Sequence, residues 1–411
     1  MFYKFPVITH LDQVREAIAG REEFIIAERE WGFVANYLVN LADTFPYPNT
    51  KDEKTNELYK IRRECRGLKF DLNGNPLARL FHKFHNYGER SEVDGRNVDF
   101  NHPFILLDKL DGSMIHPIFF NNKVVVCTKM GITDIAIPVQ GFIERGIAIV
   151  NDSEKKVDYI GFMNDMMKAG WTPLFEWCSR KQRIVVDYGV HDYLILTAIR
   201  HIITGEYKSY DEMVILAKQY DIPVVERWNG TFDGINEFMS LVQGKEGEEG
   251  CVGRFENGEG HGHMLKFKNL WYCQLHKTKE LLQFEKDVWS LIITEKQDDA
   301  KAFMDDEDKE RIDSFAADLY KAMDDFADRL KWEVIAWTDN HGDSQKKFAV
   351  DFVNNDKHGF SNHERGLLFK IKNDMENARP LVYDYILGYT STGPKINEIR
   401  NLLGGINWED Y

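Results

Sequence analysis

The sequence predicts an α+β fold: a β-rich domain of antiparallel sheets with flanking helices over residues 1–275, then an all-helical domain over residues 276–411. In the first region, short β-branched or apolar runs such as 123–129 and 193–200 alternate with turn signals. In the second, apolar residues recur every three or four positions along 312–330, which is typical of an amphipathic helix. The length of 411 residues agrees with two domains.

The composition excludes several classes of protein. A net charge of −15 is unlike that of a protein that coats nucleic acid non-specifically, although it leaves room for a local basic site. The mean hydropathy of −0.44 and the lack of a long apolar run predict no membrane span, and the N-terminus lacks the pattern of a signal peptide. Five cysteines, scattered singly, predict neither disulfides nor a zinc site and favour a reducing cytoplasm.

The elements of the first region follow from local patterns. Residues 64–70 and the turn signal at 73–76 predict a strand, a turn and a second strand. Residues 138–170 are predicted to be helical, and 174–178 and 193–200 to be buried strands. Two strand-like runs on either side of Asn257-Gly258 predict a hairpin.

The central motif of the chain is Lys109-Leu110-Asp111-Gly112-Ser113. It follows the apolar run 104–107, so the lysine lies near the end of a predicted buried strand, and Asp-Gly supports a tight turn. Burial and cationic neighbours lower the pKa of a lysine and make its amine a nucleophile. Such a pentapeptide alone is more often a plain surface turn, so its meaning depends on the motifs downstream.

Lys266 and Lys268 are two residues apart on a predicted strand, so their side chains share a face. Two ammonium groups on one face repel each other unless an anion lies between them, and a phosphate is the obvious candidate. The alternative is that this side of the strand faces solvent.

Two carboxylates are candidates for a site. Glu176 lies between two aromatic residues and points to the opposite face from both, toward either a site or solvent. Glu249 precedes Gly250 at a strand start, where it either binds a divalent cation or is an ordinary acidic turn residue. Four histidines lack a third ligand at metal spacing and are expected to face RNA or to lie at the surface: His82, His85, His261 and His263.

These motifs occur in a defined order: Lys-x-Asp-Gly at 109–112, Phe-Glu-Trp at 175–177, Glu-Gly-x-Val at 249–252 and Lys-x-Lys at 266–268. In this order the chain resembles the covalent nucleotidyltransferases, which include ATP-dependent DNA ligases, RNA ligases and mRNA capping enzymes. More specifically it resembles the phage T4 RNA ligase 1 family, in which Glu64-Cys65-Arg66-Gly67 and residues 266–272 also have counterparts. The resemblance covers most of the chain and continues through 298–301. Each motif is weak, but their ordered set is specific.

The resemblance implies a nucleotidyltransferase mechanism. Lys109 would attack the α-phosphate of ATP and release pyrophosphate; AMP would pass to the 5′-phosphate of an RNA, and a 3′-hydroxyl would displace it. Lys266 and Lys268 would neutralise the α-phosphate as charge builds, and would lower the pKa of Lys109. Glu176 would hold a ribose hydroxyl. Glu249 would help to hold Mg²⁺, or Mn²⁺ in its place.

Other positions are assigned by the resemblance alone. Arg66 and Lys83 match positions that contact the nucleotide and its phosphates. Tyr37 is the candidate for a tyrosine near the adenosine, and Lys129 for a lysine between the first two motifs.

Two further positions concern ligation and the metal. Tyr272 matches a tyrosine needed for ligation. Asp298 matches an aspartate linked to metal binding, unless it is simply an acidic residue at a helix N-terminus. The implied cofactors are therefore ATP and Mg²⁺, and the implied partner is RNA with 5′-phosphate and 3′-hydroxyl ends. No membrane is involved, and the protein is expected to be a monomer.

Three functions compete at this point. An ATP-dependent RNA ligase would act on single-stranded ends, as in tRNA repair, and in a phage would work in the host cytoplasm. A DNA ligase or capping enzyme would usually place a β-barrel after the Lys-x-Lys strand, whereas this chain turns helical. A non-catalytic RNA-binding protein should have lost motif residues, yet the nucleophile, both carboxylates and both lysines are present. The helical domain is expected to select the RNA.

Overall fold

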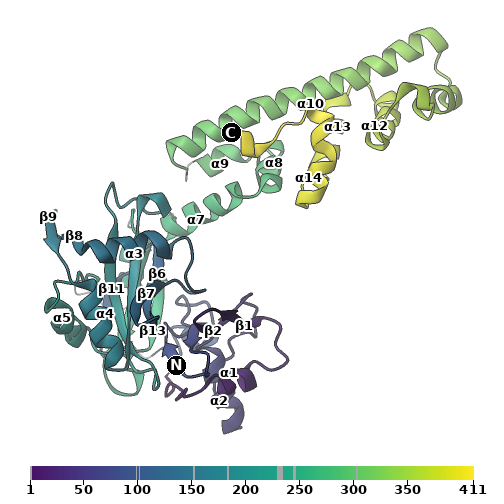
Figure 1. The fold of residues 1–411 in the computed structure, drawn as a ribbon. Helices are drawn as coiled ribbons and strands as arrows, with labels where there is room; N and C mark the ends of the chain where they lie inside the picture. The colour runs from purple at the N-terminus through teal and green to yellow at the C-terminus, as the bar shows by residue number, and fades with distance from the viewer. Residues whose placement is uncertain are drawn as a thin grey trace. The chain divides into compact units, whose positions relative to one another are not determined.

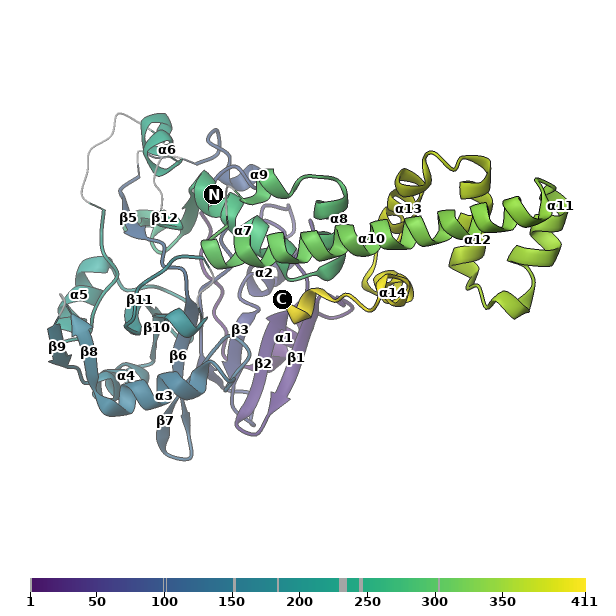
Figure 2. The same ribbon diagram turned by 90° about the horizontal axis from the view of Figure 1, so that it is seen from above.

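The computed structural model describes residues 2–98, 100, 102–150, 153–182, 185–228, 235–243, 247–301 and 304–411. The chain divides into two compact units, Met1–Cys273 and Gln274–Tyr411. Every named strand belongs to the first unit, whereas the described part of the second is built from helices (Figures 1 and 2). All strand pairs within the sheets are antiparallel, so the predicted α+β class is confirmed.

The first sheet has four strands in the order β1-β2-β3-β4. These are β1 (Phe24–Arg29), β2 (Gly32–Tyr37), β3 (Arg66–Phe70) and β4 (Pro76–Ala78), packed with helices α1 (Leu11–Ala17) and α2 (Glu53–Arg62). The predicted strand, turn and strand are thus confirmed. The Asp71 carboxylate closes the turn by accepting the N–H groups of Asn73 and Asn75, at 2.9 and 2.8 Å.

The second sheet has the order β11-β10-β6-β7. Its strands are β6 (Ser113–Phe120), β7 (Lys123–Cys127), β10 (Trp171–Cys178) and β11 (Tyr193–His201). Helices α3 (Ala136–Arg145) and α4 (Tyr159–Lys168) pack on it, and α5 (Tyr210–Lys218) packs on β11 (Figure 1). β7 is one of the two edge strands, and the Gln140 side chain covers part of it. The Gln140 amide accepts Val126 N–H at 3.0 Å and donates to the Val124 carbonyl at 3.4 Å.

The prediction of helix throughout 138–170 is wrong in part. Gly146 adopts a left-handed conformation, φ +62°, which ends α3. A hairpin of β8 (Ile147–Val150) and β9 (Ser153–Lys156) follows before α4 begins. The apolar run 147–150 is too short to show either the period of a helix or that of a strand, so periodicity alone could not tell the two apart.

The third sheet has the order β13-β12-β5 and carries the ends of the central motifs. Its strands are β5 (Phe104–Asp108), β12 (Gly250–Phe255) and β13 (Met264–Lys268), and α6 (Ile235–Gln243) packs on it. The predicted hairpin around Asn257 is the connection between β12 and β13. Because β5 belongs to this sheet and β6 to the second, the motif 109–112 lies where the chain crosses from one sheet to the other.

The second unit contains the helices from α8 onward, and α7 (Leu270–Leu282) begins in the first unit. They are α8 (Glu285–Ile293), α9 (Gln297–Lys301), α10 (Asp306–His341), α11 (Gln345–Lys347), α12 (Asn362–Asn373), α13 (Ala378–Leu387) and α14 (Gly393–Arg400), with a π-helical turn over Phe348–Val353. The predicted apolar stripe of α10 is buried, from Ile312 to Leu330. The residues that can be described include no helix both long and apolar enough to cross a bilayer.

Candidate active site

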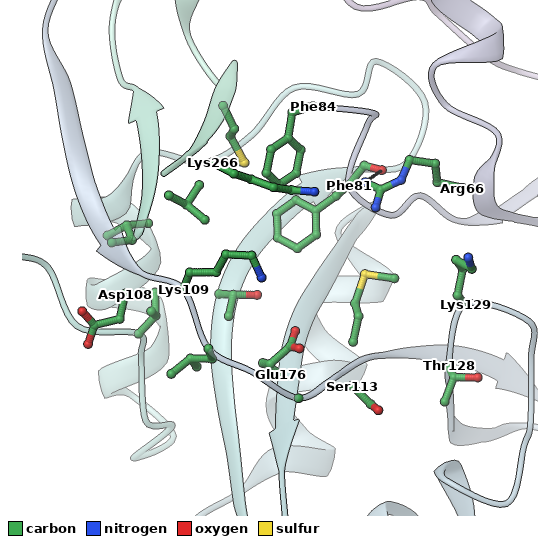
Figure 3. A pocket seen from close by; sticks show the side chains of 18 of the residues that line it. Arg66, Phe81, Phe84, Asp108, Lys109, Ser113, Thr128, Lys129, Glu176 and Lys266 are labelled. Atoms are coloured by element: carbon green, nitrogen blue, oxygen red, sulfur yellow. Dashed lines mark hydrogen bonds between the residues drawn. The ribbon is translucent and has the colours of Figure 1, made fainter. Parts of the chain in front are cut away.

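A cavity of about 510 Å³ lies beside the motif at 109–113 (Figure 3). Side chains from separate elements line it: Arg66 of β3, Phe81 and Phe84 from the segment after β4, Lys109 after β5, Glu176 of β10 and Lys266 of β13. Leu107, Val252 and Met264 add apolar surface. A cavity of this size, lined by both apolar and charged side chains, suits a nucleotide-sized ligand.

Lys109 follows β5, and its backbone N–H bonds to the Gly250 carbonyl of β12 at 3.0 Å. Its Nζ lies 2.6 Å from Oε2 of Glu249, whose other oxygen, Oε1, lies 3.0 Å from Lys268 Nζ. Glu249 is thus a buried carboxylate shared between two lysines. The pairing of Gly250 with Lys268 in the β12–β13 register brings these groups together.

Lys266 lines the cavity, and its Nζ lies 4.9 Å from the centroid of the Phe84 ring. Within the described part of the chain it makes no ion pair with a carboxylate. Burial, together with the cations of Arg66, Lys109, Lys83 and Lys268, lowers the pKa of Lys266 to about 7. An anion bound in the cavity would relieve this repulsion.

Glu176 faces the cavity, which settles the choice between site and solvent for its side chain. Its neighbours Phe175 and Trp177 point into the core below α3 and α4. Burial raises the pKa of Glu176 to about 8; nearby Glu249 and Asp111 add to this, while Lys109 opposes it. Glu176 therefore carries a proton at neutral pH and can donate a hydrogen bond to an oxygen of a ligand.

Asp111 fixes the motif to two distant segments, which the sequence did not reveal. Its Oδ2 accepts the N–H groups of Val185 and Val186 at 2.7 and 2.8 Å. Its Oδ1 accepts the Tyr272 hydroxyl at 2.8 Å. The Asp-Gly pair predicted only a turn, and no local signal pointed to these partners, because Val185 and Tyr272 lie 74 and 161 residues further along the chain.

A model of a family described as RNA ligase matches residues 64–272, half of the chain, and so spans Glu64, Lys109, Glu176, Glu249, Lys266 and Tyr272. The chain belongs to this RNA ligase family. A Thermovibrio ammonificans protein named "Putative RNA ligase" is 28% identical over 329 residues, which cover 78% of this chain and 79% of that protein.

Two solved structures are similar to this RNA ligase at low sequence identity. An archaeal ATP-dependent RNA ligase is 14% identical, with 68% of each chain covered and a TM-score of 0.43. A Naegleria gruberi RNA ligase is 16% identical with a TM-score of 0.34; the match covers 42% of this chain and about half, 51%, of that one.

Arg66 and Lys129 of this RNA ligase line the cavity, whereas Tyr37 is not among its described lining residues. Arg66 donates to the His82 carbonyl at 2.9 Å, which holds its guanidinium against the segment after β4. Lys129 Nζ lies 4.4 Å from the Tyr37 ring centroid, and Lys83 Nζ lies 5.9 Å from it on the side of a smaller cavity. Their contact with a nucleotide stays a prediction.

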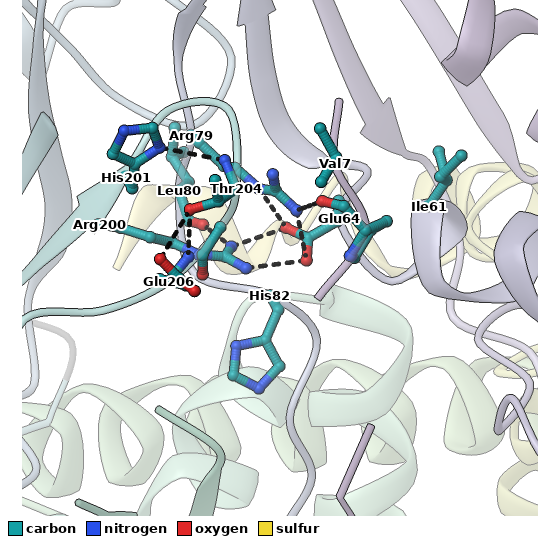
Figure 4. Close-up of polar contacts among 12 residues, drawn as sticks. Val7, Ile61, Glu64, Arg79, Leu80, His82, Arg200, His201, Thr204 and Glu206 are labelled. Atoms are coloured by element: carbon teal, nitrogen blue, oxygen red, sulfur yellow. Dashed lines mark hydrogen bonds and ion pairs between the residues drawn. The ribbon is translucent and has the colours of Figure 1, made fainter. Parts of the chain in front are cut away.

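A buried ionic network joins Glu64, which lies just before β3, to Arg200 of β11 (Figure 4). Arg200 Nη1 and Nη2 lie 2.7 and 2.8 Å from the two oxygens of Glu64, and Arg79 Nε lies 3.1 Å from Oε2. All three side chains are fully buried. Since Glu64 precedes Arg66 by two residues, the network fixes the start of β3 and with it the arginine in the cavity. Sequence analysis missed Arg79 and Arg200, because they lie far along the chain from Glu64.

The expectation that the histidines face RNA or solvent is wrong for three of them. His82, His85 and His263 are only 2%, 1% and 3% exposed. His82 Nδ1 lies 3.0 Å from the Tyr207 hydroxyl, and His263 Nε2 lies 2.8 Å from the Tyr3 carbonyl. Burial lowers the pKa of His263 to about 4, so this ring is neutral and part of the packing.

Tyr272 and Asp298 have different surroundings. Tyr272 lies in the first turn of α7, and Lys268 Nζ lies 5.0 Å from its ring centroid. Asp298 belongs to the second unit, is exposed and pairs with Lys301 at 3.2 Å. Over the described ranges, no group of three or more His, Cys, Asp or Glu side chains is arranged to hold a metal ion. The assignment of a metal to Glu249 and to Asp298 stays a prediction.

Proposed function

We propose that this RNA ligase uses ATP to join 5′-phosphate and 3′-hydroxyl ends of single-stranded RNA through a lysyl-AMP intermediate on Lys109. One observation carries the proposal. The cavity holds the Lys109 amine in the same space as the amine of Lys266 and the guanidinium of Arg66, two cations that lack a carboxylate partner among the described residues (Figure 3). An ATP phosphate would supply the missing negative charge.

In the first step the Lys109 nitrogen forms a bond to the α-phosphorus, and the bond from that phosphorus to the pyrophosphate oxygen breaks. The attacking amine must be neutral, and Glu249, at 2.6 Å, is the group in place to hold its proton. Lys266 offsets the charge that builds on the α-phosphate oxygens. Glu176, protonated at neutral pH, donates a hydrogen bond to a ribose oxygen.

Glu249 would also hold a divalent cation, Mg²⁺ or Mn²⁺, together with phosphate oxygens of the nucleotide. Mg²⁺ commonly binds through one or two carboxylates plus substrate phosphates, so a site with a single buried carboxylate fits this ion. When bound, the ion would offset phosphate charge.

The two later steps use the same cavity. The 5′-phosphate oxygen of the RNA attacks the phosphorus of lysyl-AMP and frees the Lys109 amine; a 3′-hydroxyl then attacks the RNA phosphate and AMP leaves. Tyr272 is proposed to act in this ligation stage, since its hydroxyl is bonded to Asp111 of the motif. We extend the proposal to cleaved tRNA as a substrate, and the joining of a nicked tRNA would test this directly.

Intact mass after incubation with ATP and Mg²⁺ tests the proposal. The protein is first treated with pyrophosphate to remove any AMP already bound. We expect an AMP adduct on the wild type and on the control Lys123→Ala, which removes an exposed lysine of β7, and none on Lys109→Ala. Pyrophosphate should remove the adduct.

Three outcomes would contradict the proposal. An adduct on Lys109→Ala would place the nucleophile elsewhere. A GMP adduct formed only with GTP would indicate capping chemistry. No adduct with either nucleotide would favour a non-catalytic RNA-binding protein. If the adduct forms, joining of RNA ends but not DNA ends separates an RNA ligase from a DNA ligase.

A further inference from the structure

Lys69, in the middle of β3, is fully buried and has no carboxylate partner among the residues described. Its Nζ donates to three backbone carbonyls: Gly67 at 3.0 Å, Thr128 at 3.1 Å and Lys129 at 3.1 Å. An ammonium group has three N–H donors, so these three acceptors saturate it. A buried cation held entirely by main-chain oxygens is unusual, because burial of a charge is unfavourable unless its hydrogen bonds are all made.

The titratable groups that face Lys69 provide no counter-charge at neutral pH. Burial raises the pKa of the Cys127 thiol to about 11, so it is uncharged. Burial lowers the pKa of His116 well below its usual value, so this ring is neutral. Arg29, on β1, is another cation near the same turn, and its Nε donates to the Met130 carbonyl at 3.3 Å. Burial lowers the pKa of Lys69 itself to about 7, so the amine is only partly protonated at neutral pH, and in its protonated form it is held by the three carbonyls.

The three carbonyls belong to two segments that both carry cavity residues. Gly67 directly follows Arg66 and lies at a bulge, where Ala35 pairs with Leu68 but Asn36 pairs with Arg66. The other two carbonyls belong to a tight turn, 128–131, whose Thr128, Lys129 and Met130 line the cavity. Lys69 thus connects two backbone segments: the start of β3, which carries Arg66, and the turn 128–131, which carries Lys129.

The two backbones also touch directly at this point. Gly67 has φ +93°, and a Cβ added there would lie 2.5 Å from the Lys129 carbonyl oxygen. Glycine is required both for this conformation and for this close approach. The close approach brings the Gly67 carbonyl near the Lys129 carbonyl, and the two oxygens repel each other unless a donor lies between them. The Lys69 ammonium, which donates to both, is that donor.

We propose that Lys69 is a positioning residue for nucleotide binding: its ammonium joins the β3 bulge to the turn 128–131 and so sets the separation of Arg66 and Lys129 across the cavity. The proposal rests on the proposed use of ATP for its kinetic readout. Lys69 does not touch the nucleotide; it acts through the two backbones that carry the phosphate-facing cations.

The test replaces Lys69 by a side chain of similar length without donors, Lys69→Met. The matched control is Val34→Ala, since Val34 is fully buried and lies directly opposite Lys69 in the β2–β3 register. Val34→Ala weakens the same sheet and leaves the ammonium in place. The first measurement is the rate of lysyl-AMP formation as a function of ATP concentration, which gives the KM for ATP and the maximum rate, kcat. The second is amide hydrogen exchange across residues 66–70 and 128–131.

For Lys69→Met we expect the KM for ATP to rise roughly tenfold, the effect of one lost hydrogen-bonded contact, with kcat within about twofold of the wild type. Exchange should become faster at Thr128 and Gly131, whose N–H groups close the turn. Val34→Ala should lower the melting temperature without either change. In a Lys129→Met background the effect of Lys69→Met on KM should be smaller, because part of the effect of Lys69 passes through the position of Lys129.

An unchanged KM with unchanged exchange in Lys69→Met would overturn the proposal. So would an equal rise in KM for Val34→Ala, which would reduce Lys69 to a general contribution to stability. If the wild type forms no lysyl-AMP, the proposed function fails, and the exchange measurement alone decides the role of Lys69. If Lys69→Met is insoluble, Lys69→Gln, which keeps two N–H donors, takes its place with the same expected direction.

Discussion

Lys266 and Lys268 are two residues apart on β13, yet their surroundings differ. Lys268 lies 3.0 Å from Glu249 and is paired before any ligand arrives. Lys266 faces the cavity beside Phe84 and is surrounded by other cations. The register explains the difference: β12 places Gly250, next to Glu249, opposite Lys268, and places Val252 opposite Lys266.

This difference separates two groups of cations. In one group, Lys109 and Lys268 share the Glu249 carboxylate, which offsets one of their two charges, so less electrostatic energy is left there for binding a phosphate. In the other group, Lys266 and Arg66 line the cavity without a carboxylate partner among the described residues, so a bound anion can offset their charge. Alternation along a strand decides which face a side chain occupies. The residues opposite it on the neighbouring strand decide whether it has a carboxylate partner.

Removal of Lys266 should have the largest effect. We expect Lys266→Met to slow lysyl-AMP formation roughly 100-fold to 1,000-fold, as when one preorganised group is lost from a charged transition state. The free protein should not lose stability, because an unpaired buried cation disappears. Single-turnover kinetics and thermal unfolding measure the two effects. A large loss of stability together with a small rate effect would place Lys266 in the packing instead.

Glu249→Gln tests the group in which two lysines share one carboxylate. The amide cannot balance two ammonium groups, so we expect the free energy of unfolding to fall by about 1–3 kcal/mol. Metal-free binding of ATP should become tighter, because Lys109 and Lys268 are released to meet the phosphates. Isothermal titration calorimetry in EDTA measures this affinity. Weaker metal-free binding would show that the Glu249 carboxylate does not compete with the ATP phosphates for these two lysines.

Lys268→Met should have a smaller effect than Lys266→Met. Glu249 keeps Lys109 as its partner, so the rate of lysyl-AMP formation is expected to fall only about threefold to tenfold, in line with loss of one charge-assisted hydrogen bond. The same single-turnover assay compares the two variants directly. Equal losses for the two lysines would remove the proposed asymmetry.

The smallest expected effect is the uptake of a fraction of one proton when ATP binds. In the free protein the pKa of Lys266 is about 7, so above this pH the amine is largely neutral, and a bound phosphate raises the pKa again. ATP binding at pH 8 should therefore take up part of a proton, and this uptake should vanish near pH 6. Calorimetry in buffers of different ionisation enthalpy measures it. Lys266→Met should abolish the uptake, whereas Lys268→Met should retain it.

Local patterns predicted much of the fold. The stripe from Ile312 to Leu330 gave α10 because helical spacing is encoded within a few turns. The alternation around Glu176 placed its neighbours in the core, and the β12–β13 hairpin followed from its turn residues. The hairpin at 147–156 was missed because four-residue strands carry too little periodicity.

The partners of the charged residues could not be predicted. Glu249 meets Lys109 across 140 residues, and Glu64 meets Arg200 across 136, so neither pair leaves a local signal. The burial of His82 and His263 likewise depends on Tyr207 and Tyr3, which reach them from distant segments. The resemblance selected the candidate residues, but the sheet register determined their contacts.

The Gln140 side chain over β7 has a consequence for the behaviour of the protein at high concentration. An exposed edge strand offers unpaired N–H and C=O groups on which a second chain can add a strand and begin an aggregate. Gln140 occupies such groups at Val124 and Val126, where a neighbouring molecule would otherwise pair. One amide on α3 thus protects this edge of the sheet from intermolecular pairing and favours colloidal stability without adding net charge.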